Sequence, residues 1–545
     1  MIKTTDDKYK KLLAVLLAVV AAAAVLGLFG IRYQTNDDAT LSNIAAGGYG
    51  KDTLHMVYVN VLFSALLRPF YAMAQTNWYV IIQLVLVTVS IAATGYILMK
   101  RLGLYCGLAA YAGLLVAFGR HIFYSFQYTE CAFIMLAAGL LLIADSLGRP
   151  DKSTVLGIIL SLFGAMVRWD AFYAVGGLSA CLLLFRFFSL DREKMKKAVI
   201  TMIVFFAFVF GAKTVDVIAY RADSRWGDFA AYNAARTAYS DFAVYGLPQE
   251  NPFAEMGITD IDYTMLNSWD FYDEGRFTTE LVNSAAEYRR PFSFTQLAKD
   301  SAEQLADMVT GNSGNTAFLI VIILSLACLR LSGGAAAMVG IYSTLCLFIV
   351  YLTYRMRYTR WVELGLIWTV SVFALYCISY IELPHRAKLA AAALSLAAVL
   401  AVSLPEYTQL YRDVPVYADW TRLEQNYFEQ MSRDKDNIYL LSTEAINVAA
   451  GFDVMHPRTD GFYSNIVAYG GWLSRAPHRD RALKEYGLSR PLVDAVDNPN
   501  VYLDYHRINN VVRYVQQELG VPVYAVKTGD NAFAPYQLTT TAPQQ

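Results

Sequence analysis

The sequence has few of the features that mark a soluble or secreted domain. Charged residues make up only 17% of the chain and the net charge is −1, so there is no basic field for nucleic acid. All six cysteines fall in apolar runs, and their spacing predicts neither a disulfide framework nor a zinc site. No Asn-x-Ser/Thr glycosylation acceptor occurs. With 56% hydrophobic residues, the chain is too apolar for an ordinary soluble enzyme.

Long apolar runs separated by polar loops are what the sequence does contain. The first, residues 12–30, follows several lysines and is long enough to cross a bilayer, which takes about 20 residues. No small-x-small cleavage site precedes Arg32, so we interpret this run as a retained transmembrane helix. Further runs bring the predicted total to about eleven transmembrane helices: 78–99, 102–118, 128–145, 154–167, 171–188, 198–218, 317–331, 335–351, 361–380 and 389–404.

Lysine and arginine predict the orientation of these helices. They are about twice as frequent in loops on the N-terminal side as in short loops on the other side, which predicts a cytoplasmic N-terminus. An odd number of crossings then places the C-terminus outside. Three polar segments fall on the external side: loop 31–77, with an interfacial helix over 54–70, a helical loop region over 219–316, and the tail 405–545.

The predicted fold is therefore mainly α. Residues 1–404 form a polytopic membrane helix bundle, and residues 405–545 form a small extracytoplasmic α/β domain. Within that tail, 437–441 and 521–526 are rich in strand-forming residues, and 505–519 is typical of a helix that Gly520 ends.

Two adjacent carboxylates, Asp37 and Asp38, follow the first predicted helix directly. A charge so close to hydrocarbon is partly desolvated, and it tends to bind a cation, pair with a base or shift its pKa. The alternative is a structural role, such as an N-cap for the next helix, and the second aspartate of such a pair is the better candidate for a cap.

A cluster of three arginines, Arg355, Arg357 and Arg360, lies at the non-cytoplasmic face, against the positive-inside bias. Interfacial anchoring beside Tyr and Trp is one interpretation. The other is an anion site, because guanidinium groups bind phosphate in a planar, bidentate way. We favour a phosphate site, since lysine would serve equally well as an anchor.

Other charged residues at external helix ends are weaker candidates for binding substrate: Glu130, Arg168, Asp170 and His55. Arg168 and Asp170 could equally lie at the interface beside Trp169. Aromatic and acidic residues also gather at 232–241 and 262–273, a pattern that suits sugar rings but is equally expected of a small folded loop domain. Gly470, Gly471 and Trp472 in the tail could line a cleft.

The predicted topology, with paired acids after the first helix (Asn36, Asp37, Asp38), an interfacial helix and an external C-terminal domain, resembles the GT-C superfamily. These membrane glycosyltransferases use polyprenyl-phosphate-linked sugars. The resemblance covers roughly residues 1–404 and implies that Asp37 or Asp38 acts as general base or metal-site carboxylate. The oligosaccharyltransferase motif Trp-Trp-Asp-Tyr-Gly is absent, so transfer to asparagine is not expected.

By position, the resemblance also implies that the arginine cluster holds the lipid phosphate. A divalent metal, Mg or Mn, could bind Asp37, Asp38 and Glu130 through oxygen ligands. The expected function is transfer of a sugar from a polyprenyl-phosphate donor to a cell-envelope glycan or lipid, at a bacterial plasma membrane. The alternative is a lipid-linked sugar flippase or other polytopic transporter, although no internal repeat is evident.

Overall fold

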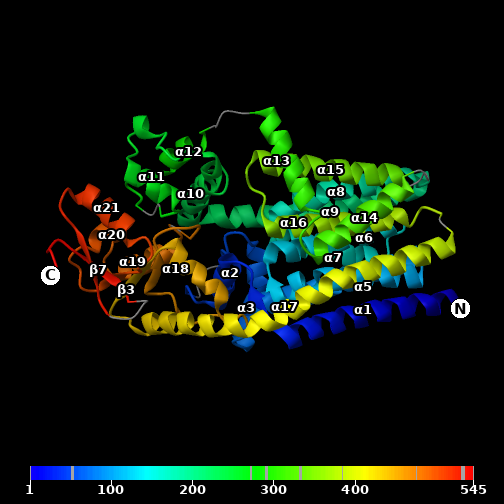
Figure 1. Cartoon of the computed structure of the whole chain (residues 1–545), viewed down its shortest axis with the longest axis horizontal. Coiled ribbons are helices and arrows are strands. Elements are labelled where there is room, and N and C mark those ends of the chain that lie inside the picture. The colour runs from blue at the N-terminus through cyan, green and yellow to red at the C-terminus, as the bar shows by residue number, and fades with distance from the viewer. Residues whose placement is uncertain are drawn as a thin grey trace.

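The two chain termini lie at opposite ends of an elongated, mainly helical molecule (Figure 1). The computed structural model describes residues 2–50, 54–270, 273–288, 293–329, 334–382, 384–473, 475–529 and 534–543. Phe271 and Tyr272, part of the aromatic segment 262–273, lie outside the described residues. The described residues extend from the N-terminal end of the molecule to its polar end.

One half of the molecule is a bundle in which each predicted apolar run forms a helix. Nine helices in the described part of the chain are long and apolar enough to cross a membrane, while α7 and α14 have 16 residues each. The predicted membrane helix bundle is therefore confirmed. Its helices are α1 (Ile2–Phe29), α4 (Trp78–Leu102), α5 (Leu104–Gly119), α6 (Tyr128–Ser146), α7 (Lys152–Val167), α8 (Trp169–Phe188), α9 (Arg192–Ala222), α14 (Ser313–Cys328), α15 (Ala335–Tyr354), α16 (Arg360–Ile378) and α17 (His385–Arg433).

Helices α6 and α16 form the centre of this bundle, because most of their residues are buried inside the protein. Close packing of α6 on α7 depends on glycine. A Cβ at Gly139 of α6 would collide with Ser161 and Gly157 of α7, so only a residue without a side chain fits there. Small residues at helix contacts are how membrane helices approach one another.

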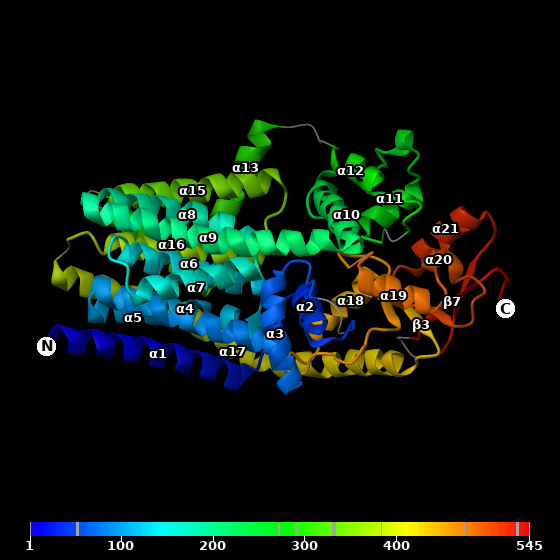
Figure 2. The same cartoon turned by 180° about the vertical axis from the view of Figure 1, so that it is seen from behind.

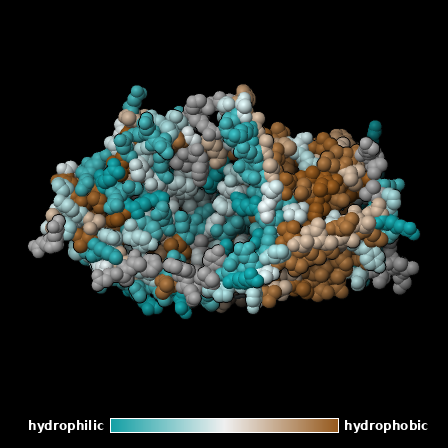
Figure 3. All heavy atoms as spheres, viewed as in Figure 1, coloured by the Kyte–Doolittle hydropathy of each residue, from teal (hydrophilic) through white to brown (hydrophobic). Residues whose placement is uncertain are grey.

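The outer surface of the bundle is hydrophobic, and the other half of the molecule is mostly hydrophilic (Figure 3). Helices at the edge of the bundle expose large apolar side chains, among them Leu12, Phe208 and Leu347. Such a surface suits lipid rather than water. The boundary between the two surfaces separates the membrane bundle from the polar end.

Shorter helices near the polar end come from the two predicted external loops. Loop 31–77 provides strand β1 (Arg32–Tyr33), α2 (Asn36–Ala46) and α3 (Val61–Met73), where the interfacial helix was expected. Strand β1 pairs in parallel with β2 (Ser125–Phe126), which follows the short π-helix η1 (Arg120–Tyr124). Region 219–316 provides α10 (Ser224–Ser240), η2 (Ala243–Gly246), η3 (Ala254–Met256), α11 (Asp260–Asn267), α12 (Thr279–Ala286) and α13 (Phe294–Asp307).

The small C-terminal sheet is also present. Its five strands lie in the order β4-β3-β5-β7-β6, with β3 parallel to β4 and β5, and β7 antiparallel to β5 and β6. They are β3 (Ile438–Leu441), β4 (Ile466–Ala468), β5 (Val501–Leu503), β6 (Tyr524–Lys527) and β7 (Tyr536–Thr539). Helices α18 (Thr443–Asn447), α19 (Pro477–Glu485), α20 (Pro491–Asp494) and α21 (Ile508–Leu519) and the turn η4 (Val448–Gly451) accompany them. Gly520 ends α21 with φ +67°, as predicted.

Helix α17 joins the bundle to this sheet. Its 49 residues span roughly 70 Å at 1.5 Å per residue, and it runs from the bundle along the polar end (Figure 2). The predicted boundary between residues 404 and 405 falls inside this one helix, and the sheet begins only at Ile438. Although Pro405 and Pro415 lack backbone N–H donors, both lie within the helix.

Candidate functional site

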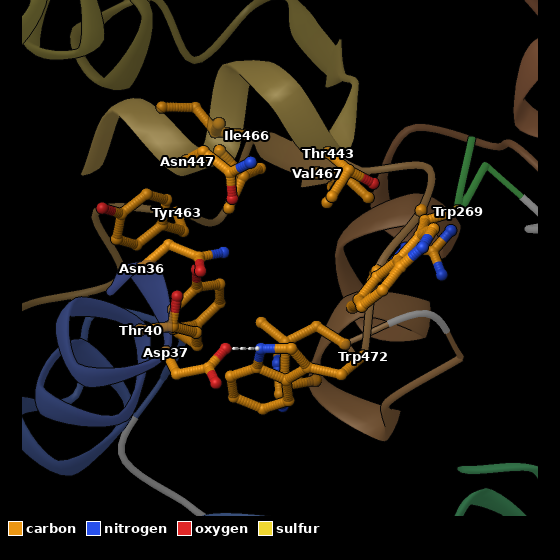
Figure 4. Close-up of a pocket in the computed structure, with 18 of the residues that line it drawn as sticks. Asn36, Asp37, Thr40, Trp269, Thr443, Asn447, Tyr463, Ile466, Val467 and Trp472 are labelled. Atoms are coloured by element: carbon orange, nitrogen blue, oxygen red, sulfur yellow. Dashed lines mark hydrogen bonds between the residues drawn. The ribbon is translucent and has the colours of Figure 1, made fainter. Parts of the chain in front are cut away.

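A cavity of about 500 Å³ lies where loop 31–77 meets the C-terminal segment (Figure 4). Its walls come from α2, α18, β4, α19 and the loop around Trp269. The size is that of a small-molecule site. Two backbone N–H groups join the segments at this junction: Tyr463 N–H donates to the backbone Gly48 O at 2.9 Å, and Arg458 N–H donates to the side-chain Asn43 Oδ1 at 2.7 Å.

Asp37 is the sequence-predicted carboxylate that faces this cavity. It lies in the first turn of α2, where the positive end of the helix dipole favours a negative charge. The indole Nε1 of Trp472 donates a hydrogen bond to Asp37 Oδ1 at 2.7 Å (Figure 4). Desolvation by burial raises the pKa of Asp37, and the positive charge of Arg168 and the Trp472 hydrogen bond partly oppose this effect.

Arginines and a tyrosine surround the Asp37–Trp472 pair. The ring of Tyr58 packs against Trp472 with centroids 5.0 Å apart, and the Arg168 guanidinium lies over the same Tyr58 ring, 5.0 Å from its centroid. Arg236 is fully buried and donates to Tyr58 Oη at 3.2 Å. Its charge also lowers the pKa of Asp37. The carboxylate is thus held in a dry, aromatic setting with positive charge nearby.

Asp38 has a structural environment instead. Its carboxylate accepts hydrogen bonds from the Tyr128 N–H at 2.9 Å and the Thr35 hydroxyl at 3.0 Å, and its side chain is buried. Tyr128 is the first residue of helix α6, so the hydrogen bond from its N–H to Asp38 connects the first loop to the bundle. Two neighbouring aspartates therefore have different surroundings.

The three arginines of the predicted anion cluster do not share one cavity. Arg357 lines the cavity with Asp37 and lies 3.8 Å from Asp241. Arg355 lies over the ring of Phe242, 4.1 Å from its centroid, at a different cavity. Arg360 is paired with Glu363 and donates to Asn315 Oδ1 at 2.8 Å, inside the bundle end. Of the cluster, the structure brings only Arg357 to Asp37.

The weaker candidates lie outside the described lining of the cavity. Glu130 is buried in the first turn of α6, and the Asp170 side chain is 72% exposed and pairs with Arg168 at 2.9 Å. His55 stacks on Trp226 with ring centroids 4.4 Å apart, and its Nε2 lies 3.3 Å from Ala219 O. None of these side chains is among the described residues that line the cavity.

The donor set for a metal is incomplete among the residues that the structure describes. No group of three or more His, Cys, Asp or Glu side chains there is placed to hold a metal ion. Asp38 and Glu130, two members of the predicted set, do not line the cavity with Asp37. Binding of Mg or Mn at Asp37 stays a prediction.

Sequence reasoning missed most of the cavity wall. Trp269, Trp472 and Arg507 reach it from segments more than 200 positions from Asp37. Gly470-Gly471-Trp472 carried a weak signal as a possible cleft, and Trp269 belonged to the aromatic segment of the second loop. Nothing in the linear pattern indicated that these two segments meet Asp37.

Comparison with known proteins gives no match to any family model or curated protein. Two solved structures of ArnT from Cupriavidus metallidurans are similar to this chain, one in the apo state and one bound to undecaprenyl phosphate. The first covers 97% of this chain and 97% of its own at 10% identity, and the second 98% and 99% at 10% identity. Both have a TM-score of 0.38, a level of similarity that assigns no role to any residue of the cavity.

Proposed function

We propose that this membrane protein is a glycosyltransferase that moves a sugar from a polyprenyl-phosphate donor to an extracytoplasmic acceptor. The donor lipid would sit in a bacterial plasma membrane, and the acceptor would be a glycan or lipid of the cell envelope. One observation carries the proposal: Asp37 and Arg357 line one cavity at the polar end of a membrane helix bundle. A carboxylate and a guanidinium in one pocket provide both charges that such a transfer needs.

In this reaction Asp37 takes the proton of the acceptor hydroxyl. The hydroxyl oxygen forms a bond to the anomeric carbon of the sugar as the bond from that carbon to the phosphate oxygen breaks. The raised pKa of Asp37 makes its carboxylate a stronger base than that of an exposed aspartate, and the charge of Arg168 and the hydrogen bond from Trp472 favour its ionised form. General-base catalysis of this kind contributes typically about 10²–10⁴-fold in rate.

Arg357 is the residue placed to receive the departing phosphate. A guanidinium binds two phosphate oxygens at once and stabilises the negative charge that develops as the sugar leaves. Its partner Asp241, 3.8 Å away, keeps the arginine in the cavity wall before substrate binds. The separation exceeds a hydrogen-bond distance, so phosphate can displace this partner at low cost.

The test is a transfer assay with purified protein in proteoliposomes. The donors are polyprenyl-phosphate hexoses and pentoses that carry a radiolabelled sugar, and the acceptor is an envelope extract. We expect the label of at least one donor to leave the lipid and enter a new glycosidic product. Label that crosses between leaflets while it stays on the lipid would instead identify a flippase and contradict the proposal.

A further inference from the structure

Aromatic rings from two segments that lie far apart in the sequence surround the cavity. Figure 4 shows Trp269 of the second loop region and Tyr463 and Trp472 of the C-terminal segment around its opening. Tyr463 is held flat against Tyr49, with ring centroids 4.5 Å apart and an interplanar angle of 9°. Fixed aromatic faces offer apolar area at low cost in conformational entropy, and the CH faces of sugar rings pack against such surfaces.

Trp269 adopts a backbone conformation that a bulky residue rarely takes. Its φ of +66° lies in the left-handed region, and its carbonyl oxygen accepts a hydrogen bond from Gly471 N–H at 2.8 Å. Such strain persists where the surroundings determine the conformation, and it clusters at sites that bind ligands. The fold therefore holds this indole in the cavity wall at an energetic cost.

His478 provides hydrogen-bonding groups that the protein itself leaves unused. Its side chain is 8% exposed and lines the cavity, and among the described residues neither ring nitrogen has a hydrogen-bond partner. Burial, reinforced by the charges of Arg479 and Arg481, lowers the pKa of His478 to about 3. The neutral imidazole has one donor and one acceptor nitrogen, which matches hydroxyl groups better than a phosphate.

The charges of the cavity wall balance one another. The lining includes four carboxylates and four arginines: Asp37, Asp241, Glu444, Glu485, Arg357, Arg479, Arg481 and Arg507. Arg507 is paired with Glu444 at 2.6 Å, and Arg357 lies near Asp241. A wall without net charge favours a neutral, hydroxyl-rich ligand over an acidic polymer.

We propose that the part of the cavity bounded by Trp269, Tyr463 and His478 is a binding subsite for a neutral sugar ring. This inference rests on the proposed function and deepens it, because it names the class of ligand that binds in this part of the cavity. The sugar belongs either to a glycan acceptor or to the lipid-linked donor. The chemistry of recognition is the same for both sources, and the experiment separates them.

The experiment measures binding of the full-length protein, in nanodiscs, to an array of lipid-free neutral and acidic envelope oligosaccharides. Variants Trp269→Ala and His478→Ala are compared with the wild type, and Tyr411→Ala on α17, 66% exposed, is the matched control. A second arm measures binding of polyprenyl-phosphate hexoses and pentoses by the same four proteins.

We expect wild-type protein to bind at least one neutral sugar in one arm, and each cavity variant to lose roughly tenfold in affinity while Tyr411→Ala keeps it. If the cavity variants lose affinity for oligosaccharides of the array, the subsite binds a glycan acceptor. If they lose affinity only for the lipid-linked sugars, it binds the sugar of the donor. The inference is overturned if no neutral sugar binds in either arm, or if binding survives both substitutions. Undiminished sugar transfer by both cavity variants in the transfer assay would then leave the proposed function intact.

Discussion

Asp37 and Asp38 are neighbours of one residue type, and their side chains have different partners. Asp38 accepts a backbone N–H and a hydroxyl and is buried, whereas Asp37 accepts one indole N–H and faces a cavity. The sequence pattern left both aspartates as candidates and favoured Asp37 slightly, since the second aspartate of such a pair more often caps the following turn. The structure adds that Asp37 is the one that faces the cavity.

The hydrogen bond from Trp472 acts on the pKa of Asp37, and removing the bond should shift that pKa in a known direction. This bond lowers the pKa of Asp37, so Trp472→Phe raises that pKa. A general base must be ionised, and activity is lost as the pH falls through its pKa. The acid limb of the kcat/KM profile should therefore move to higher pH by roughly one unit in the variant.

The control for this profile is Trp78→Phe, which removes an indole hydrogen bond to Ala74 O at 3.0 Å, outside the described cavity wall. Its acid limb should coincide with that of the wild type. A Trp472→Phe profile that falls in rate at every pH without any shift would mean that Trp472 shapes the cavity but does not act on Asp37.

At the scale of elements, the loop that follows β4 delivers Trp472 to α2. Gly470 leaves no room for a side chain, because a Cβ there would lie 2.6 Å from Thr443 Oγ1 and 2.7 Å from Asp270 Oδ1. Gly471 has φ +74° and is bonded to Trp269 O. The two glycines thus fix the loop between Trp269 and α18, and Trp472 follows directly.

Gly470→Ala should shift this loop and weaken the Asp37–Trp472 contact. We expect a loss of unfolding free energy of about 1–3 kcal/mol, as for other overpacked sites, together with reduced sugar transfer. Thermal unfolding and the transfer assay measure the two effects. Gly227→Ala on α10 is the control, since its added Cβ meets only Tyr220 O at 3.7 Å. Equal transfer by both variants would contradict this role for the loop.

At the scale of the whole molecule, most of the fold was predictable and most of the site was not. An apolar run predicts a helix from local sequence alone, and the runs 12–30 and 128–145 correspond to α1 and α6 in the structure. Helix α17 continues through Pro405, where a boundary was predicted. Trp269 and Trp472 reach Asp37 only through long-range packing, which no local pattern encodes.

Chain segments far apart in sequence therefore complete one site. The first loop supplies Asp37, the loop between α15 and α16 supplies Arg357, and the C-terminal segment supplies Trp472. Helix α2 and the C-terminal segment lie toward the end of the molecule opposite the N-terminus (Figure 2). The account's central claim is that Asp37, at this junction, is the base for sugar transfer.

Substitution of each aspartate by asparagine, with transfer and donor binding measured side by side, tests that claim most directly. Asp37→Asn keeps the shape of the side chain and removes its basicity, so transfer should fall by about 10²-fold or more while donor affinity and folding stay near wild type. Asp38→Asn should lower the unfolding temperature, because its hydrogen bonds lose a charged acceptor. Wild-type transfer by Asp37→Asn would contradict the account.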